Sequence, residues 1–258
     1  PPTIGEGGLS VRDLRVLTAA GAVVVDNVSF DVRPGEVLAI AGVQGNGQTE
    51  LAEAIVGLQE EVEGSITLGG VELVGKSVRG ILDEGVGFVP EDRQEDGLVT
   101  ALSVAENLML DRSADTRFRR FGTIRRAILD RFARDRIAEF DIRTQGPDSP
   151  AGSLSGGNQQ KVVIARELSR DLKLLLASQP TRGVDVGSIE FIHKRIIGTR
   201  DAGVPVVVVS TELDEVVALA DRIAVMYRGG IIGIVPADTP RDVLGLMMAG
   251  ENPTEEAA

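Results

Sequence analysis

Apolar and polar positions alternate along this chain in patterns that predict strands and helices in turn. Period-two alternation at residues 10–17 and 23–32 predicts two strands, and the apolar run at 37–41 predicts a buried strand. Further strands are expected at 64–68, 86–90, 172–177, 204–210 and 222–228. Helical spacing of apolar residues predicts one helix directly after residue 49 and three more at 189–200, 213–220 and 240–248. Strands that alternate with helices indicate an α/β fold with a largely parallel sheet.

The middle and the ends of the chain follow other patterns. Between residues 103 and 170 there is no convincing strand signal, and Ile124, Ile128, Phe132 and Ile137 lie near one face of a helix. This predicts an all-helical subdomain at about 103–170 within one domain spanning 9–250. We expect a linker at residues 1–8, which begins with Pro and indicates a piece of a longer chain, and a disordered acidic tail at 251–258.

The composition of the chain excludes several classes of function. The 258 residues include 39 acidic and 27 basic side chains, for a net charge of -12, which argues against a broad nucleic-acid-binding face. With no Cys and one His, disulfide frameworks, Cys/His zinc sites, thiol nucleophiles and Ser-His-Asp triads are essentially excluded. The longest apolar stretches, such as residues 204–209, are far shorter than the roughly 20 residues that span a bilayer.

A glycine-rich loop at residues 42–49 joins a predicted buried strand to a predicted helix. The phosphate-binding P-loop has the pattern G-x-x-x-x-G-K-[ST], in which backbone amides cradle phosphate, Lys neutralises it and the hydroxyl holds Mg²⁺. Gly42, Gly47 and Thr49 fit this pattern, but Gln48 replaces the Lys. Gln carries no charge, so we expect weakened nucleotide binding. The alternative is a tight turn between strand and helix.

A second glycine motif, LSGGNQQK at residues 154–161, precedes the helical run at 162–168. A Ser followed by two Gly at a helix start presents a hydroxyl and unpaired amides, where the helix dipole favours an anion. The motif therefore fits a phosphate. The alternative is an ordinary N-cap followed by flexible glycines.

Together these motifs resemble the nucleotide-binding domains of ABC transporters over nearly the whole chain. The segment LSGGNQQK precedes LLLASQPTRGVD, and the details QPTRGVDVGSIEFIH, VGFVPEDR and SVAENLML are most similar to one subgroup. That subgroup is the second, C-terminal domain of the tandem ATPases that drive simple sugar and nucleoside importers. The resemblance implies a P-loop NTPase core with a mainly parallel sheet, an N-terminal antiparallel β region and an α-helical subdomain.

In this family each ATP site takes its P-loop, Walker B strand, Q-loop and switch histidine from one domain. By resemblance, this chain lacks the family's usual residues at several of these positions, so its own half of the site is degenerate. The positions are Gly42, Gly45, Gly47, Gln48 and Thr49 in the P-loop, Glu91 at the Q-loop, Ser178 for the Walker B Asp, Gln179 for the catalytic Glu, and Thr211 for the switch His. Without the cation and the carboxylates, hydrolysis at this loop should be very slow. ATP, with Mg²⁺ at Thr49, would bind weakly or not at all.

The other half of each family site, the signature and the D-loop, comes from the opposite domain. Here this half matches the family, with Leu154, Ser155, Gly156 and Gly157 in the signature and Asp185 in the D-loop. We therefore hypothesise that this domain completes the ATP site of a sister domain. The alternative is a scaffold or regulatory domain of the same fold that binds no nucleotide in its own pocket.

The resemblance also implies partners and a location. They are an N-terminal sister ATP-binding domain in the same chain, transmembrane permease subunits and, indirectly, an extracytoplasmic solute-binding protein, with no nucleic acid. Such a protein is cytoplasmic and peripheral on the inner face of the cell membrane. An ABC ATPase acting on DNA or ribosomes is disfavoured by the acidic balance. The solute stays open between sugars and nucleosides, and QPTRGVD favours nucleosides slightly.

Other charged residues have plainer interpretations. His193 is expected to be an ordinary, partly exposed helix residue, and Lys161 and Arg166 to pair on a helix surface near Glu167. Residues 112–136 carry nine Arg against three Asp, which indicates a solvated face with internal ion pairs or a surface that docks on a membrane partner or its lipid.

Overall fold

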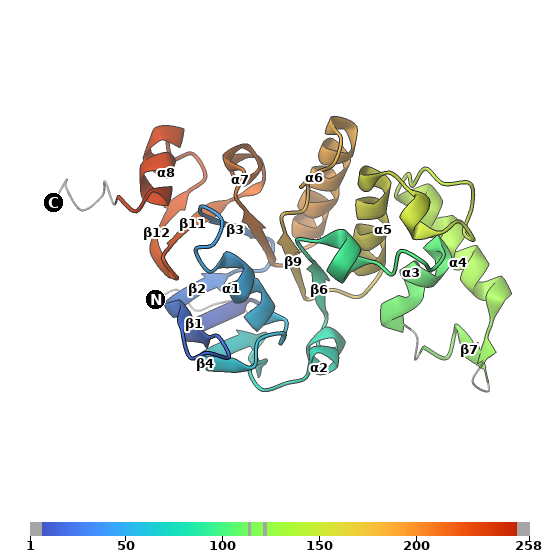
Figure 1. Ribbon diagram of the computed structural model, residues 1–258, viewed down its shortest axis with the longest axis horizontal. Coiled ribbons are helices and arrows are strands. Elements are labelled where there is room, and N and C mark those ends of the chain that lie inside the picture. Colours follow the sequence, from blue (N-terminus) through green and yellow to red (C-terminus); the bar gives the residue numbers. More distant parts are fainter. Residues whose placement is uncertain (1–6, 113–114, 121–122, 252–258) are drawn as a thin grey trace. The chain divides into compact units, whose positions relative to one another are not determined.

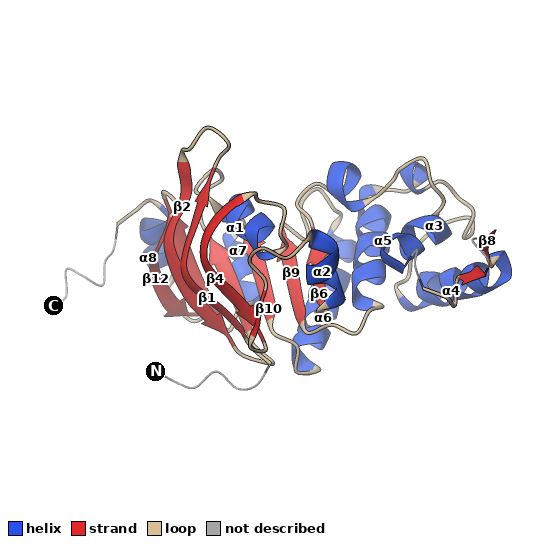
Figure 2. Ribbon diagram, turned by 90° about the horizontal axis from the view of Figure 1, so that it is seen from below, coloured by secondary structure: helices blue, strands red, loops and turns tan. Residues whose placement is uncertain are grey.

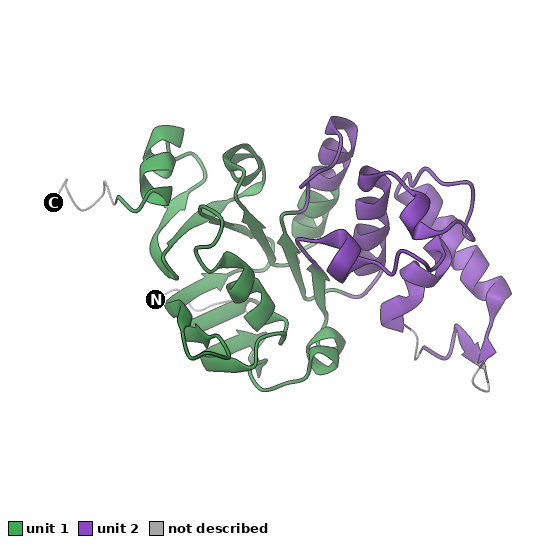
Figure 3. Cartoon of the chain, viewed as in Figure 1, with its two compact units in different colours: residues 1–88, 172–179, 195–258 green, residues 89–171, 180–194 purple. Residues whose placement is uncertain are grey.

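A computed structural model describes residues 7–112, 115–120 and 123–251. Most of the predicted linker and of the predicted tail lies outside these residues. The chain divides into two compact units, the first of residues 1–88, 172–179 and 195–258 and the second of residues 89–171 and 180–194 (Figure 3).

The first unit contains an antiparallel sheet with strand order β2-β1-β4-β5 (Figure 2). Its strands are β1 (Leu9–Leu17), β2 (Val23–Val32), β4 (Glu61–Leu68) and β5 (Val71–Glu72). In β1 the buried positions change phase, from Leu9 and Val11 to Leu14 and Val16. An irregularity in the pairing between Val11 and Leu14, where Asp13 has a φ of 48°, accounts for the change. The predicted N-terminal antiparallel β region is confirmed.

A second sheet in this unit has the order β12-β11-β3-β10-β9-β6. Its strands are β3 (Val37–Ala41), β6 (Val86–Val89), β9 (Leu174–Ser178), β10 (Val206–Ser210), β11 (Arg222–Tyr227) and β12 (Gly230–Pro236). β3 pairs in parallel with β10 and β11, and β10 pairs in parallel with β9. Every residue of β3, β9 and β10 is buried, as in parallel sheets covered on both faces. The α/β fold with a mainly parallel sheet is confirmed.

The edge strand β12 was not predicted from the sequence. It pairs antiparallel with β11 through a tight turn, in which Arg228 and Gly229 have φ values of 47° and 84°. A two-residue hairpin turn of this kind needs positive φ at both central positions, which Gly favours. The Gly229-Gly230 pair between two apolar runs was the signal that could have revealed this hairpin.

The first unit also contains α1 (Gln48–Ile55), α2 (Val78–Asp83), α7 (Leu213–Leu219), α8 (Arg241–Met248) and the last part of α6 (Val186–Asp201), from Arg195 onward. α1 contacts strands of both sheets (Figure 1). Its fully buried Leu51 and Ile55 join one core with residues of β1, β2, β3 and β10. α7 and α8 pack Val216 and Leu244 into a second core. The position of α1 fixes the end of the loop that precedes it.

The second unit is mainly helical. It holds the one-turn π-helix η1 (Arg93–Gly97), α3 (Val104–Met109), η2 (Leu110–Arg112), α4 (Arg126–Glu139), η3 (Ala151–Ser153), α5 (Gly156–Leu168) and the first part of α6 (Val186–Asp201). It also contains a two-residue ribbon, β7 (Arg119–Arg120) with β8 (Thr123–Ile124), where no strand was predicted. Among the described residues, no helix is both long and apolar enough to cross a membrane.

The predicted apolar face of α4 was wrong. Ile124 lies in β8 and is 38% exposed, while the buried positions of the helix are Leu129 and Ala133. These two residues lie four positions apart and so share one face. Phe132 is only partly buried and stacks edge-on against Phe118 at 5.2 Å between ring centroids.

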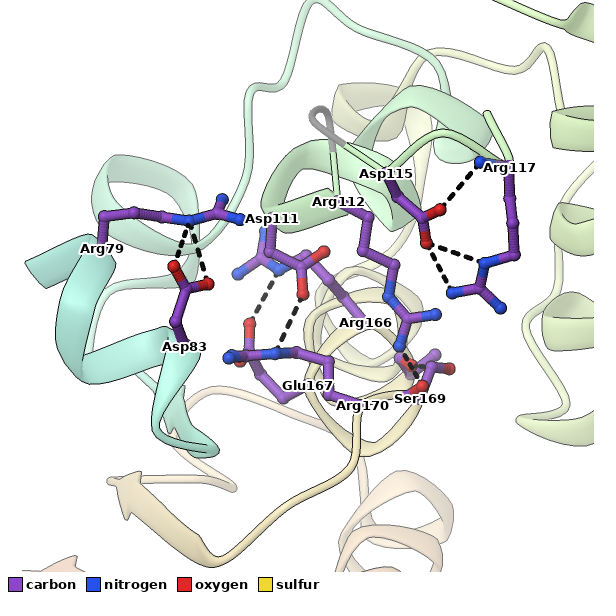
Figure 4. A network of polar contacts seen from close by, with 11 residues as sticks. Arg79, Asp83, Asp111, Arg112, Asp115, Arg117, Arg166, Glu167, Ser169 and Arg170 are labelled. Carbon is purple, nitrogen blue, oxygen red and sulfur yellow. Dashed lines mark hydrogen bonds and ion pairs between the residues drawn. The ribbon is translucent and has the colours of Figure 1, made fainter. Parts of the chain in front are cut away.

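The prediction of surface positions for Lys161 and Arg166 was also wrong, because both are buried. Lys161 Nζ donates to the Asp141 carbonyl at 2.8 Å and pairs with its carboxylate at 3.0 Å. Arg166 Nε donates to Glu167 at 2.8 Å, inside a charged cluster at the end of α5 (Figure 4). His193 is partly buried on α6, as expected. The Arg-rich segment does carry internal ion pairs, Arg117 with Asp115 and Arg134 with Asp130.

Candidate functional site

The glycine loop leaves β3 at Ala41 and enters α1 at Gln48, with Gly47 as the N-cap. Gly47 has a φ of 97°, and a Cβ there would lie 2.4 Å from the Val24 carbonyl oxygen. A Cβ on Gly42 would lie 2.5 Å from the Met226 carbonyl oxygen. Both positions therefore require Gly, because the loop packs directly on the backbone of β2 and β11.

Asn46 ties this loop to the hairpin turn between β11 and β12. Its side-chain Oδ1 accepts a hydrogen bond from the Arg228 backbone N–H at 2.9 Å, and its carbonyl accepts one from Gly229 N–H at 3.0 Å. Two hydrogen bonds thus hold the loop at Asn46, between its ends at β3 and α1.

Gln48 turns its side chain back into the loop, where it is 5% exposed. Its Nε2 donates to the Val43 carbonyl at 3.1 Å, and its Oε1 accepts from the Asn46 backbone N–H at 3.1 Å. In a P-loop the backbone N–H groups cradle phosphate and the Lys supplies charge. Here one such N–H is already bonded to Gln48, and the replacing side chain is neutral. Thr49 is exposed at the start of α1.

The three other degenerate positions predicted from the sequence lie at the ends of β9 and β10. Ser178 ends β9 and is 2% exposed, and no hydrogen-bond partner of its Oγ appears among the described residues. Gln179 has a φ of 48°, and its side chain bonds Thr211 just beyond β10. The structure therefore brings Gln179 and Thr211 together.

Mg²⁺ fits this set of side chains poorly. Hard cations of this kind are held by carboxylates, together with phosphate oxygens and water. Ser178 offers only a neutral hydroxyl, and in the described part of the chain no group of three or more Asp, Glu, His or Cys could hold a metal.

The signature residues lie at the N-terminus of α5, where the extended backbone of Ser155 is followed by the first helical residue, Gly156. Ser155 is the exposed N-cap of α5, but its Oγ caps no helix amide. The Oγ instead accepts from Asn158 Nδ2 at 2.8 Å, and Asn158 Oδ1 accepts from Arg143 N–H at 2.7 Å. Ser155 and Asn158 also line an open cleft of about 1000 Å³, which sequence analysis did not reveal. The hydroxyl is thereby oriented at the positive end of the helix dipole.

Asp185 lies directly against this helix start. A Cβ on Gly157 would be 2.5 Å from Asp185 Oδ2 and 2.3 Å from Ser188 Oγ. Asp185 accepts from the Ser188 hydroxyl at 2.8 Å and from its backbone N–H at 3.0 Å. These hydrogen bonds, led by the hydroxyl, lower the pKa of the Asp185 carboxyl. Ser188 was missed from the sequence, although a Ser three residues after an Asp at a helix start is a capping signal.

Glu91 follows β6 and forms an ion pair with Arg182, the third residue before Asp185. The residues of the predicted site are spread over both units, and Glu91 lies apart from the rest of the glycine-loop half. The glycine loop, Ser178, Gln179 and Thr211 belong to the first unit, whereas Glu91, the signature residues and Asp185 belong to the second. The signature residues and Asp185 are contained in one unit.

Known proteins match this chain over most of its length. A family model described as ABC transporter matches residues 25–182. The chain is 46% identical over 248 residues to the nucleoside import ATP-binding protein NupA of Lactococcus lactis subsp. cremoris (strain MG1363), covering 96% of this chain and 49% of that protein. It is 44% identical over 249 residues to the glucose import ATP-binding protein TsgD13 of Haloferax volcanii, covering 95% and 45%. The chain therefore spans about half the length of these relatives.

A solved structure supports the same assignment at the level of the fold. The nucleotide-free ATP-binding cassette of an ABC transporter superposes with a TM-score of 0.75, covering 95% of this chain and 96% of that one, at 22% identity. With the glycine loop, the signature helix and the family match in place, this chain belongs to the ABC transporter family, as one of its ATP-binding domains.

Proposed function

We propose that this chain is a nucleotide-binding domain of an ABC importer, the second, C-terminal domain of a tandem ATPase. Residues 9–250 form the domain. The curated relatives are about twice as long as this chain and are named import ATP-binding proteins, which supports the proposal. ATP hydrolysis drives import in the whole protein, and the isolated domain has very low or no ATPase activity.

One observation carries this proposal: a backbone N–H of this chain's own glycine loop is already hydrogen-bonded to a side chain, whereas the signature serine is exposed. In its own loop the Gln48 side chain bonds the backbone N–H of Asn46, a group of the kind that binds phosphate. At the signature, Ser155 is exposed at the start of α5, and Asp185 lies against that helix. We infer that ATP binds chiefly to a P-loop of the sister domain and is covered by Ser155 and Asp185 of this one.

Hydrolysis at the loop of this domain is disfavoured on electrostatic grounds. Phosphoryl transfer needs positive charge on the transferred group, Mg²⁺ support and a carboxylate that orients water. The residues present are Gln48, Ser178 and Gln179, which are all neutral. ATP or ADP held there would be bound by backbone amides and Thr49 and would turn over slowly.

Ser155→Arg in the full-length, two-domain protein tests the proposal. A long cationic side chain at the helix start would fill the space of the phosphate, so we expect ATPase activity and transport to be lost. Ser153→Arg is the matched control, since Ser153 is also exposed but lies before the signature. Unchanged ATPase and transport in Ser155→Arg would show that the proposal is wrong.

The second candidate function is a scaffold that binds no nucleotide in its own pocket, and the occupied Asn46 amide favours it. Calorimetric titration of ATP and ADP with Mg²⁺ into this chain, with a phosphate-release assay, separates the two. Binding without turnover indicates a regulatory half-site. No binding at millimolar ATP indicates a scaffold that donates only its signature, and rapid turnover would contradict both.

The proposed partners are transmembrane permease subunits and, through them, an extracytoplasmic solute-binding protein. The domain would act on the inner face of the cell membrane, without nucleic acid, in keeping with its net charge of -12. Co-purification with a permease rather than with ribosomes tests this point. Sugar and nucleoside relatives are about equally similar to this chain, so uptake of labelled nucleoside against glucose decides the solute.

A further inference from the structure

The short segment after Glu91 is held rigidly in the second unit. Asp92 caps the π-helical turn η1, since its Oδ1 accepts from the backbone N–H groups of Gln94 at 2.8 Å and Glu95 at 3.1 Å. These bonds lower the pKa of Asp92, so the cap stays ionised near neutral pH. Arg93 is the first residue of this turn, and its direction is fixed by the cap.

The Arg93 guanidinium donates to two successive backbone carbonyls in the turn before Asp185. Nη1 lies 2.7 Å from the Arg182 oxygen and Nη2 lies 3.3 Å from the Gly183 oxygen. A planar fork of donors suits two neighbouring acceptors, which a single ammonium group serves less well. Gly183 has a φ of 66°, which gives the turn the form that presents both oxygens.

The same guanidinium lies against the start of the signature helix. A Cβ on Gly156 would be 2.6 Å from Arg93 Nη2 and 3.1 Å from the Gly183 carbonyl oxygen. Arg93 is thus wedged between the first residue of α5 and the turn that carries the D-loop. One side chain sets the spacing of two elements that are 27 residues apart in the sequence.

Neighbouring contacts hold the Arg93 segment on α5 without using Arg93 itself. Gln94 Nε2 donates to Gln159 Oε1 at 3.0 Å, and Arg166 Nη1 donates to the Gly97 carbonyl at 2.7 Å. We expect these contacts to keep η1 in place when Arg93 is changed. A substitution of Arg93 should therefore remove the hydrogen bonds to the carbonyls of Arg182 and Gly183, while η1 remains attached to α5.

We propose that Arg93 is a positioning residue, which holds the signature helix and the D-loop turn in register for the ATP of the sister domain. This inference rests on the proposed function, because it presumes that Ser155 and Asp185 close on that ATP. Groups that contact a reacting phosphate must be placed within a fraction of an ångström, and small displacements cost about a hundredfold in rate. Arg93 would act through Gly156 and Gly183 and would not touch nucleotide.

The test uses the full-length protein with Arg93→Met, which keeps much of the length and lacks donors, and Arg93→Lys, which keeps one cationic donor. We expect Arg93→Met to lower kcat about tenfold or more, while the Kd for ATP without Mg²⁺, a property of the sister P-loop, changes less than about twofold. Arg93→Lys should recover part of kcat. Arg131→Met is the matched control, since Arg131 is exposed on α4, and it should leave kcat unchanged.

A normal kcat in Arg93→Met overturns this proposal, and if Ser155→Arg still abolishes activity, the proposed function stands. An inactive Arg93→Met together with an unaffected Ser155→Arg overturns both. Loss of ATP affinity in parallel with kcat would indicate general damage and overturns the positioning role. If Arg93→Met fails to fold, Arg93→Lys decides, with a lowered kcat at unchanged Tm supporting the proposal and a normal kcat overturning it.

Discussion

Gln179 and Thr211 form a mutual hydrogen-bonded pair across the ends of β9 and β10. Gln179 Nε2 lies 3.3 Å from Thr211 Oγ1, and Gln179 Oε1 accepts from the Thr211 backbone N–H at 3.3 Å. By resemblance to the family, these positions hold a carboxylate and an imidazole in active domains. Here both groups are neutral and satisfy each other, so neither is poised to orient water.

Restoring the carboxylate alone should not restore hydrolysis. In Gln179→Glu the new side chain can still accept from Thr211 N–H, but Gln48 and Ser178 remain neutral and leave transferred charge uncompensated. We expect phosphate release by this chain to stay at the wild-type level. Gln179→Ala is the control for loss of the pair with Thr211. A tenfold rise in Gln179→Glu would show that the glycine loop is competent as it stands.

Gln48→Lys should strengthen ATP binding to this chain about tenfold, equivalent to about 1.4 kcal/mol. The change frees the Asn46 N–H and supplies the missing charge. Calorimetric titration of ATP measures it. Gln44→Lys adds the same charge to an exposed position of the same loop without removing the Gln48 contact, and should have an effect below about threefold. Equal gains in both variants would contradict a specific role for Gln48.

Gly157→Ala should destabilise the second unit by about 1–3 kcal/mol, since its methyl group would meet Ser188 Oγ at 2.3 Å. Urea unfolding of this chain measures the change. Gly198→Ala in α6 is the control, because nothing lies within 4 Å of the added carbon, and it should raise stability by about 0.5–1 kcal/mol. A neutral Gly157→Ala would mean that Asp185 and Ser188 move away without cost.

Asp111→Ala should lower the free energy of unfolding by about 3 kcal/mol. Asp111 is paired with Arg170 at 3.3 Å, and their side chains are 9% and 13% exposed (Figure 4). Removal of the carboxylate leaves a buried guanidinium with less compensation. Asp130→Ala breaks the exposed pair with Arg134 and should cost less than about 1 kcal/mol. Similar losses in the two variants, in urea melts, would contradict the role of burial.

Asp111 also makes stability depend on pH. Burial, with a smaller effect of the Glu167 carboxylate, raises the pKa of Asp111 above its unfolded value of about 3.9. The folded state therefore binds this proton more tightly, and the stabilisation is lost as pH rises through the folded pKa. Stability of the wild type relative to Asp111→Asn should fall from pH 4 upwards and then level off. Urea melts over that range that show the opposite slope would contradict the raised pKa.

The strands were predicted well where the pattern was local. β1, β2 and β3 appear within one residue of expectation because alternation or a continuous apolar run marks them. β12 was missed although the Gly229 turn was visible, and the buried face of α4 was misplaced by one position. In α4 the pattern is weak, because partly exposed apolar residues such as Phe132 also recur at helical spacing.

In the candidate site, too, the sequence revealed what local motifs mark and missed the contacts between distant residues. Motif spacing alone indicated Gln48 as a neutral replacement in the glycine loop and Ser155 as the start of the signature helix. It did not indicate that Lys161 is buried against Asp141, or that Arg93 reaches Gly183. These partners lie 20 and 90 residues apart, and no periodicity links them.

The sequence by itself determined the family of this protein, its alternation of strands and helices, and the neutral side chains at Gln48, Ser178 and Gln179. These properties reside in residue identity and local spacing. Only the tertiary structure decided that the side-chain oxygen of Gln48 accepts a hydrogen bond from the Asn46 N–H in its own loop. Only the tertiary structure decided, too, that Arg93 joins the signature helix to the D-loop turn. Such hydrogen bonds depend on distances of about 3 Å between side chains and backbone, which are set by packing of the whole unit.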